Sequence, residues 1–408
     1  MCLQRQHKTC IVVGETGSGK STQLPQYLAE ERGSRALSVV CTQPRRVAAI
    51  TIASRVAAER GCSVGEEVGY AVRFEDKSSA VTRIKYVTDG LLLRETISDP
   101  LLSKYDVVIL DESHERSLQT DILMGLLKGI QVKRPTFRLV IMSATLEVDL
   151  FMNFFDDTHA IHIPGRQFPV QIYYTKQPEE DFIDAAFLTC LQIHAEEEAG
   201  GILVFLPGQE DIENLTYLLE EHLPFIQSKH SSSRHQRENA RLMQDFCIFP
   251  LYAAMPQEEQ LLAFQTPAPG VRKIVVATNI AETSLTISGV RYVVDSGFHK
   301  SRAVSSSGME TLRVTLVSQS QANQRAGRAG RESSGKCFRL YCESAFERLE
   351  QASIPEIKRM NIAQVVLELK AMGIDASAFP FPSPPPPASI SRAVNTLHAL
   401  GAIDKSKV

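Results

Sequence analysis

Short apolar runs alternate with amphipathic segments along most of the chain. In the first part of the sequence, runs rich in Val, Ile and Leu lie at residues 9–13, 36–42, 84–87, 106–110, 138–143 and 159–163. Near-continuous apolar strands separated by helical patterns are typical of parallel sheets that helices cover on both faces. This part of the sequence therefore predicts an α/β domain.

The same pattern then repeats, which predicts a second domain of similar size. After a connector at residues 165–170, apolar runs recur at residues 202–206, 247–252, 273–277, 291–295 and 336–341. Two successive units of this kind predict two similar domains that face each other across a cleft.

The last part of the chain changes character. Residues 362–372 and 390–403 have the apolar periodicity of helices, and residues 380–387 between them contain six prolines and must be extended. A proline tract can bind SH3-like partners, but its place between two helices favours a rigid connector. We place the domain boundaries at 1–168, 169–348 and 349–408.

Composition narrows the class of protein. Of the 408 residues, 43% are hydrophobic and 22% charged, which is typical of a soluble globular protein, and no apolar run approaches the roughly 18 residues of a membrane span. A formal net charge of −3 argues against coating of nucleic acid by bulk electrostatics, but it is compatible with a local basic channel. The eight cysteines form no C-x-x-C pair, which favours reduced thiols in an intracellular protein.

The first candidate site follows the first apolar run. Residues 14–22, GETGSGKST, fit the pattern G-x-x-x-x-G-K-[ST] between a strand and a helix, so backbone N–H groups can wrap a polyphosphate. Lys20 would reach the β and γ phosphates and Ser21 would hold Mg²⁺. The alternative is a glycine-rich turn without function. The predicted nucleotide contacts are Gly14, Glu15, Thr16, Gly17, Ser18, Gly19, Lys20, Ser21 and Thr22.

An acidic pair follows the apolar run at residues 106–110. Asp111 and Glu112 would emerge at the carboxyl edge of the sheet, where α/β proteins bind ligands. Asp111 is placed to hold the Mg²⁺ shell, and Glu112 to take a proton from an attacking water. Acids at a helix N-terminus are the alternative interpretation. Downstream of a phosphate-binding loop, the pair favours a site of nucleotide hydrolysis.

The second domain carries a complementary motif at residues 324–331, QRAGRAGR. Arg325, Arg328 and Arg331 recur every three residues, which on a helix puts them on adjoining positions of one face. Arg328 and Arg331 would act as arginine fingers on a γ-phosphate, and Gln324 would orient the water. A solvated basic face is the alternative. The interspersed glycines cost about 1 kcal/mol each in a helix, which indicates a close approach by some other group.

Together with five further motifs, these residues resemble the DEAH-box RNA helicases of superfamily 2. The further motifs lie, in the family's order, at residues 42–49, 88–95, 143–145, 205–210 and 277–287. Ser113 stands where the family's D-E-A-H has alanine, and His114 is retained. The resemblance implies two tandem RecA-like parallel-sheet domains followed by a partial C-terminal winged-helix segment.

The resemblance also implies roles for individual residues. Residues that line or support the RNA channel would be Arg45, Arg46, Arg73, Thr88 and Asp89. Ser143 and Thr145, with His114 nearby, would link hydrolysis to domain movement. Further nucleotide contacts would be Ser284 and Thr286, which sense the nucleotide and position water, and Arg55 and Phe264, which sandwich the base.

One further segment resembles a family feature, and some family domains are expected to be missing. Residues 297–317 resemble the hairpin that acts as a wedge on nucleic acid, although an ordinary edge hairpin has the same pattern. Relative to the family, we expect the chain to lack the ratchet and OB-fold domains and the segment that precedes the first strand. The sequence therefore leaves open whether the chain unwinds RNA and whether an activator protein stimulates it.

The leading hypothesis is an ATP-dependent RNA helicase or RNP remodeller. It would use Mg²⁺ with ATP or other nucleoside triphosphates, act as a monomer on single-stranded RNA or RNP, and take an activator protein as a further partner. The family suggests the nucleus or nucleolus, with the cytoplasm as an alternative, and no membrane. A second hypothesis is a truncated RNA- or partner-binding remnant with weak ATPase activity, and a third is a P-loop ATPase that acts on DNA or protein.

Overall fold

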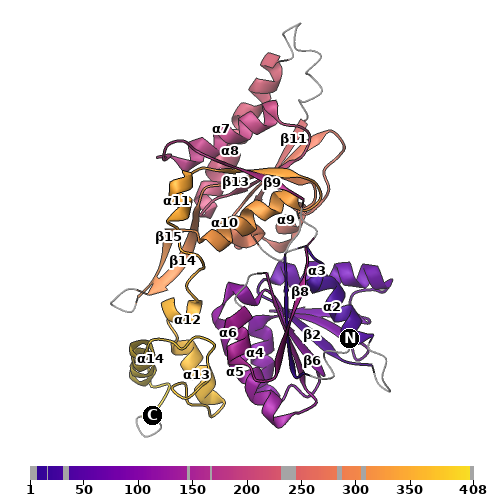
Figure 1. The fold of residues 1–408 in the computed structure, drawn as a ribbon, viewed down its shortest axis with the longest axis vertical. Helices are drawn as coiled ribbons and strands as arrows, with labels where there is room; N and C mark the ends of the chain where they lie inside the picture. The colour runs from indigo at the N-terminus through magenta and orange to yellow at the C-terminus, as the bar shows by residue number, and fades with distance from the viewer. Residues whose placement is uncertain are drawn as a thin grey trace. The chain divides into compact units, whose positions relative to one another are not determined.

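The computed structural model describes residues 7–15, 17–30, 36–144, 148–165, 168–230, 245–282, 287–304 and 309–404, without the side chains of 224–230. The chain divides into two units (Figure 1). Unit 1 comprises residues 1–165, 302–312 and 354–408, and unit 2 comprises residues 166–301 and 313–353.

Unit 1 contains an 8-stranded sheet in the order β4-β3-β5-β2-β6-β7-β1-β8. All neighbouring strands are parallel except β3 and β4, which are antiparallel. The strands are β1 (Thr9–Gly14), β2 (Val39–Gln43), β3 (Val68–Val72), β4 (Glu75–Lys77), β5 (Ile84–Thr88), β6 (Val107–Leu110), β7 (Arg138–Ser143) and β8 (Thr158–Ile163). The six predicted strands are confirmed.

The pair β3 and β4 was not predicted from the sequence. Strand β3 contains a glycine, which weakens a strand pattern. The structure gives the reason for this glycine, because a Cβ on Gly69 would lie 2.5 Å from the carbonyl oxygen of Lys77. The close pairing of the two strands therefore requires glycine at this position.

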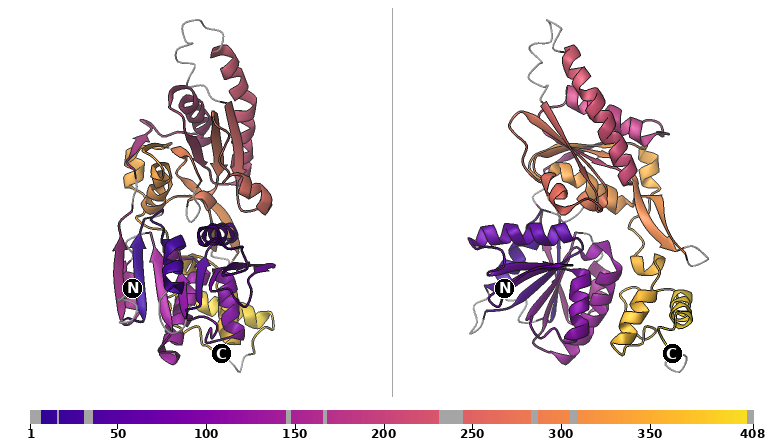
Figure 2. Two further views of the ribbon diagram at one scale, coloured as in Figure 1. Left: turned by 90° about the vertical axis from the view of Figure 1, so that its right-hand side faces the viewer. Right: turned by 180° about the vertical axis from the view of Figure 1, so that it is seen from behind.

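Helices cover both faces of the unit 1 sheet, as Figures 1 and 2 show. They are α2 (Lys20–Ala29), α3 (Arg46–Arg60), α4 (Asp89–Ser98), α5 (Leu118–Lys133) and α6 (Val148–Phe154). Alternate strand residues such as Ile11, Val108 and Ile141 join one hydrophobic cluster with α4 and α5. Because strand side chains alternate between faces, Val12, Ile109 and Val140 are buried on the face that carries α2 and α3.

Unit 2 contains a parallel 6-stranded sheet in the order β11-β12-β10-β13-β16-β9. Its strands are β9 (Val170–Tyr174), β10 (Gly201–Phe205), β11 (Asp245–Leu251), β12 (Val271–Ala277), β13 (Val290–Asp295) and β16 (Gly335–Arg339). Its helices are α7 (Phe182–Glu196), α8 (Gln209–His230), α9 (Gln257–Leu262), α10 (Gln319–Ala326) and α11 (Glu343–Glu347). The five predicted strands are confirmed, and the sequence missed β9, which follows the predicted connector.

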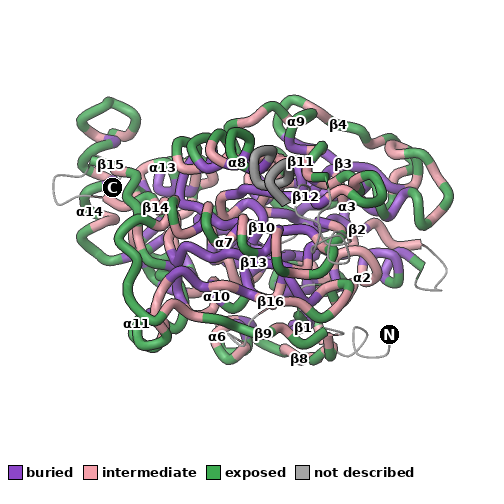
Figure 3. Tube along the Cα trace, turned by 90° about the horizontal axis from the view of Figure 1, so that it is seen from above, coloured by how far each residue is buried: buried purple, intermediate pink, exposed green. Residues whose placement is uncertain are grey.

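Strand alternation also separates the two cores of unit 2. Ile202, Val204 and Val276 pack with α7 and α8, whereas Leu203 and Val275 pack on the opposite face with residues that follow β12 and end α10. Figure 3 shows the central strands β10, β12 and β13 of this sheet as largely buried. The α/β fold class with two parallel sheets is therefore confirmed.

Strands β14 (Phe298–Val304) and β15 (Glu310–Leu316) form a separate two-stranded sheet. The predicted hairpin is thus present, whereas its role as a wedge stays a prediction. Among the described residues, no helix combines the length and the apolar character that crossing a bilayer requires.

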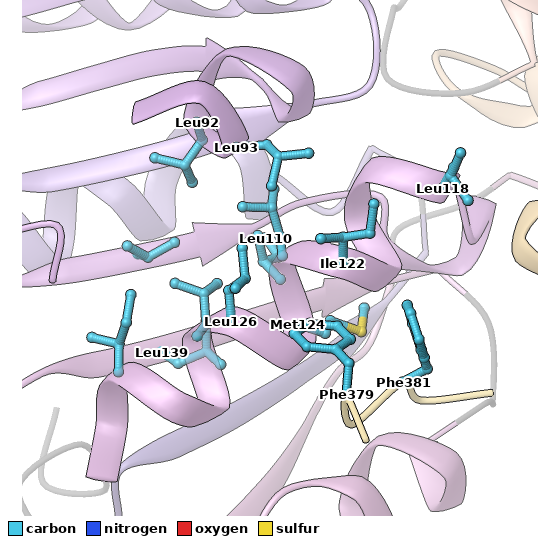
Figure 4. Packing of buried hydrophobic residues seen from close by; sticks show 14 of the residues in the cluster. Leu92, Leu93, Leu110, Leu118, Ile122, Met124, Leu126, Leu139, Phe379 and Phe381 are labelled. Atoms are coloured by element: carbon cyan, nitrogen blue, oxygen red, sulfur yellow. The ribbon is translucent and has the colours of Figure 1, made fainter. Parts of the chain in front are cut away.

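The C-terminal segment belongs to unit 1 and consists of α12 (Glu356–Arg359), α13 (Ala363–Ala371) and α14 (Pro387–Ala399). The two helices predicted here are confirmed, although α14 begins three residues early because Pro387 occupies its first turn, where proline is well tolerated. The rings of Phe379 and Phe381 lie against α5 (Figure 4). The segment therefore shares the hydrophobic core of the first sheet.

Gly125 of α5 allows this close packing. A Cβ at Gly125 would lie 2.4 Å from the ring of Phe379 and 2.5 Å from the carbonyl oxygen of Pro380, whereas a Cβ at Gly129, one turn later, would meet nothing within 4 Å. Replacing a helical glycine with alanine favours the helix by about 1 kcal/mol. At Gly125 we expect overpacking to outweigh this gain.

We predict that Gly125→Ala lowers the free energy of unfolding by about 1–3 kcal/mol, since the added methyl group must displace Phe379 or the backbone. The matched control, Gly129→Ala, should raise it by up to about 1 kcal/mol. Urea unfolding of both variants gives the comparison. Equal stabilisation by the two substitutions would contradict the packing described here.

Candidate nucleotide site

The loop after β1 has the backbone of a phosphate-binding loop. Gly17 and Gly19 have φ values of 92° and 81°, a left-handed region that side chains rarely adopt. Gly19 is the N-cap of α2, and no acidic residue occupies the first turn of that helix. The positive end of the helix dipole therefore faces the loop without a competing carboxylate, as an anion site requires.

Lys20 lies within the curve of this loop. Its side chain is only 8% exposed, and its Nζ donates to the carbonyl oxygens of Gly14 and, at 2.9 Å, Glu15. Ser18 Oγ lies 3.5 Å from the same nitrogen. The loop thus concentrates positive charge at the place where the sequence predicts phosphates.

The topology of the sheet brings the predicted motifs to one edge. Strands β2, β6, β7 and β1 are neighbours in this order and run parallel, so their carboxyl ends meet. Gln43 ends β2, Asp111 follows β6, Ser143 ends β7 and Gly14 ends β1. The first-domain motifs therefore surround the carboxyl edge of the sheet, where ligands of such sheets bind.

Asp111 is buried at this edge. Its carboxylate accepts hydrogen bonds from Gln43 Nε2 at 2.6 Å and from the N–H of Glu112 at 2.8 Å. Burial and the charge of Glu112 raise the pKa of Asp111, while a hydrogen bond with Ser21 and the charge of Lys20 oppose the rise. The structure thus joins Ser21 to Asp111, and these hard oxygen ligands suit a divalent cation.

Gln43 is a residue of this site that sequence reasoning missed. Within the described part of the chain, its buried Oε1 has no hydrogen-bond partner. The residue belongs to the motif at residues 42–49, from which only the two arginines were assigned roles. A glutamine directly after an apolar strand, at the same sheet edge as an acidic pair, was the available signal.

Glu112 is buried and held in an unusual backbone conformation. Its φ is 50° and ψ is 33°, and a short 3-10 helix, Ser113–Glu115, follows. His114 Nε2 lies 3.5 Å from Glu112 Oε2. His114 Nδ1 accepts a hydrogen bond from the N–H of Ala144 at 3.2 Å, whereas its buried Nε2 makes no hydrogen bond within the described residues. His114 therefore connects Glu112 to the motif that ends β7.

Ser113, the departure from D-E-A-H, is accommodated without an unpaired hydroxyl. Its buried Oγ donates to the carbonyl oxygen of Leu110 at 3.0 Å. Serine therefore preserves the turn that places Glu112 and His114.

The predicted RNA contacts at residues 45, 46 and 73 differ in their surroundings. Arg45 is the N-cap of α3 and pairs with Glu115 at 3.0 Å, whereas Arg46 is exposed. Arg73 is exposed beside Phe74, which is 89% exposed, with 4.7 Å between the guanidinium carbon and the ring centroid. An exposed ring with a cation is a surface on which bases can stack.

Thr88 ends β5 and is the N-cap of α4, and Asp89, the first residue of that helix, is buried. Its carboxylate accepts a hydrogen bond from Thr120 Oγ1 at 2.8 Å, and Ser117 Oγ lies at 3.5 Å. Burial raises the pKa of Asp89 to about 6, and the hydrogen bond from Thr120 opposes this rise. Of the two roles predicted for this residue, its burial fits support of the channel and not its lining.

The arginine motif in unit 2 differs from the predicted helix face. Helix α10 ends at Ala326 and a 3-10 helix, Gly327–Gly330, follows, so the arginines do not share one α-helical face. Arg325 is fully buried and pairs with Glu282 at 3.2 Å and Asp295 at 2.6 Å. Arg328, also buried, donates to the backbone carbonyl of Glu282.

The other members of this motif also have definite positions. Gln324 lies on α10, and it and Arg331 are intermediate in burial. Gly330 provides the predicted close approach, because a Cβ there would lie 2.5 Å from the carbonyl oxygen of Phe168. The approaching group is therefore this unit's own chain. The catalytic roles of Gln324, Arg328 and Arg331 stay predictions.

The remaining nucleotide assignments stay untested. Arg55 is 70% exposed on its side chain and pairs with Glu59 at 2.6 Å, and Phe264 packs partly buried against the second core of unit 2. Their predicted sandwich of the base stays a prediction. Thr16, Thr145, Ser284 and Thr286 lie outside the described residues.

Family models match both parts of the chain. The DEAD/DEAH box helicase model matches residues 1–152, and the helicase conserved C-terminal domain model matches residues 185–333. The chain therefore carries both domains of a DEAD/DEAH box helicase. Its two sheets are consistent with the tandem RecA-like domains predicted from the sequence.

Individual helicases resemble the chain over nearly its whole length. Pre-mRNA-splicing factor ATP-dependent RNA helicase prp22 of Schizosaccharomyces pombe is 51% identical over 403 residues, covering 98% of this chain and 33% of prp22. Probable ATP-dependent RNA helicase DHX35 of Homo sapiens is 48% identical over 417 residues, covering 99% of this chain and 58% of DHX35.

A solved structure agrees with these matches. The crystal structure of the Escherichia coli DEAH/RHA helicase HrpB has a TM-score of 0.87 and 34% identity, covering 99% of this chain and 49% of HrpB. The helicase chain thus spans between about a third and three fifths of the length of these relatives.

The buried Asp89 gives a pH-dependent prediction. Because its folded pKa is raised, its contribution to stability is fully present below the unfolded value of 3.8 and is lost as pH rises through about 6. We predict that Asp89→Asn raises the free energy of unfolding by about 1–3 kcal/mol at pH 7.5. Its advantage should disappear below pH 4, as urea titrations across this range would show.

Asp99 provides a control of opposite sign. It is only partly buried, and hydrogen bonds from Ser103 lower its pKa, so Asp99→Asn should not stabilise the protein at pH 7.5. An Asp89→Asn variant no more stable than wild type at pH 7.5 would contradict the cost assigned to the buried charge.

Proposed function

We propose that this helicase chain hydrolyses ATP and uses the hydrolysis to move on or remodel single-stranded RNA or RNP. The observation that carries the proposal is the meeting of Lys20 and Ser21 with Asp111 and Glu112 at one sheet edge. The names of prp22 and DHX35 as ATP-dependent RNA helicases support it.

The residues of unit 1 suggest a division of labour for hydrolysis. The N-terminus of α2 and the Lys20 ammonium would bind the phosphates, and Ser21 and Asp111 would hold Mg²⁺. Bound Mg²⁺ would supply positive charge that offsets the charge of the phosphates. Glu112 would accept the proton of the attacking water on its carboxylate, and His114 would orient that carboxylate.

RNA is the nucleic acid that we propose as substrate. Exposed Arg46 and Arg73, with the ring of Phe74, offer contacts to phosphates and bases that need no defined sequence. We further propose nucleotide tolerance beyond ATP, a monomeric state, an activator protein as partner and a nuclear location, the last supported by the splicing-factor relative. The binding-remnant alternative is not favoured, because the relatives are named as ATP-dependent RNA helicases.

We predict that Glu112→Gln lowers kcat for ATP hydrolysis by about 10²–10⁴-fold, since the amide cannot accept the proton of water. Affinity for ATP should change little. The checks are phosphate release at saturating ATP and equilibrium binding of a fluorescent ATP analogue. A matched control is Glu95→Gln, on α4 away from the loop, which should keep wild-type turnover. Normal turnover by the Glu112 variant would refute its assignment as the base.

We predict that single-stranded RNA stimulates this hydrolysis and that Arg73→Ala weakens RNA binding for all sequences alike. Loss of one phosphate contact should reduce the slope of log K against log salt by about 1. Arg83→Ala is the control, because this exposed residue precedes β5 at the amino end of the strands. Stimulation by DNA but not RNA, or tight RNA binding without stimulation, would overturn the RNA-motor proposal.

A further inference from the structure

The turn between β6 and α5 contains two residues in an unfavourable backbone conformation. Glu112 has a φ of 50° and Arg116 a φ of 49°, one on each side of the short 3-10 helix. Non-glycine residues persist in this left-handed region only when surrounding contacts hold them there. The contacts that hold Arg116 therefore bear on the conformation of the turn that carries Glu112.

Glu356, the first residue of α12, contacts the chain on both sides of Ser117. Its own N–H donates to the carbonyl oxygen of Arg116 at 3.2 Å. Its Oε2 accepts from the N–H of Leu118 at 3.0 Å. One residue of the C-terminal segment thus fixes the orientation of both peptide groups at the end of the turn, 238 positions away along the chain.

A second residue of the segment contacts the side chain of Arg116. The guanidinium donates to both carboxylate oxygens of Asp121, at 2.8 and 2.9 Å, and to Ser383 Oγ at 3.0 Å. Arg116 is only 3% exposed and Asp121 is fully buried, so little water competes for these bonds. A buried charge is costly unless such partners surround it, which makes the position of Arg116 sharply defined.

Apolar packing holds the segment in place for these contacts. Phe379 and Phe381 lie against α5 near Met124 (Figure 4). Ile357 belongs to the same hydrophobic cluster. The close fit of Phe379 over Gly125 leaves little room to slide. The segment therefore contacts the turn from a fixed position within the core.

We propose that Glu356 is a positioning residue for ATP hydrolysis. By holding the peptide groups of Arg116 and Leu118, it keeps the turn in the conformation that directs Glu112 and His114 toward the sheet edge. Glu356 itself touches neither nucleotide nor water in this scheme. The inference rests on the proposed function, in which Glu112 is the base.

The experiment compares three variants of the full chain. Glu356→Ala removes the acceptor for Leu118, Glu356→Gln keeps an acceptor oxygen of the same reach, and Gln364→Ala changes an exposed residue of α13 whose side chain contacts Glu368. We expect Glu356→Ala to lower kcat at least about fivefold, because small displacements of a catalytic group have large effects on rate. Its KM and its affinity for a fluorescent ATP analogue should change less than about twofold.

The conservative variant Glu356→Gln and the control variant Gln364→Ala distinguish a positioning role of Glu356 from general support of the fold. Glu356→Gln and Gln364→Ala should remain within about twofold of wild type in kcat. Unchanged kcat in Glu356→Ala would overturn the proposal, as would a parallel loss of kcat and nucleotide affinity. If Glu356→Ala does not fold, Ser383→Ala removes a single hydrogen bond from Arg116, and the same split between kcat and affinity is required of it.

Failure of this inference is distinguishable from failure of the proposed function. An inactive Glu112→Gln variant with a normal Glu356→Ala variant would remove only the positioning role. Normal hydrolysis by Glu112→Gln would instead remove the base, and with it the foundation of the inference.

Discussion

The arrangement of this helicase chain depends on two adjacent carboxylates being buried at the end of β6. Burial disfavours their charge, which raises the pKa of Asp111, so each neighbouring group must offset that cost. Gln43 at the end of β2 and Lys20 and Ser21 at the start of α2 do so for Asp111, from two other segments. A parallel sheet makes this possible because the carboxyl ends of its strands meet at one edge. The burial of these carboxylates at the sheet edge is thus both a cost to stability and the source of the site's chemistry.

In unit 2, the cost of burying a positive charge is likewise offset by neighbouring groups. Arg325 is fully buried, which is tolerable only because Glu282 and Asp295 surround its guanidinium group. Arg328 binds the backbone of the same Glu282, which lies within the motif at residues 277–287. Two motifs that are separate in the sequence therefore share one residue as support. A change at Glu282 would disturb both.

Much of this architecture could be predicted from residue patterns, because strands such as β1, β6 and β12 are buried on both faces and form unbroken apolar runs. Strand β9 lies at a sheet edge with its residues partly exposed, so its pattern is weak. The end of α10 at Ala326 was missed since the arginine spacing suggested a continuous helix. The contact of Glu356 with Leu118 could not be found, because nothing local marks a hydrogen bond between segments so far apart. Gln43, by contrast, could have been found, because it ends an apolar strand at the same sheet edge as the acidic pair.

The shared core of α5 and the C-terminal segment has a consequence for biosynthesis. The apolar face of α5 emerges from the ribosome long before Phe379, Phe381 and Leu397, which join its cluster. At roughly 5–20 residues per second, more than 200 residues must be added while that face lacks its final cover. Such surfaces attract chaperones and promote aggregation. The first unit, although it begins the chain, is therefore among the last parts to complete its folding.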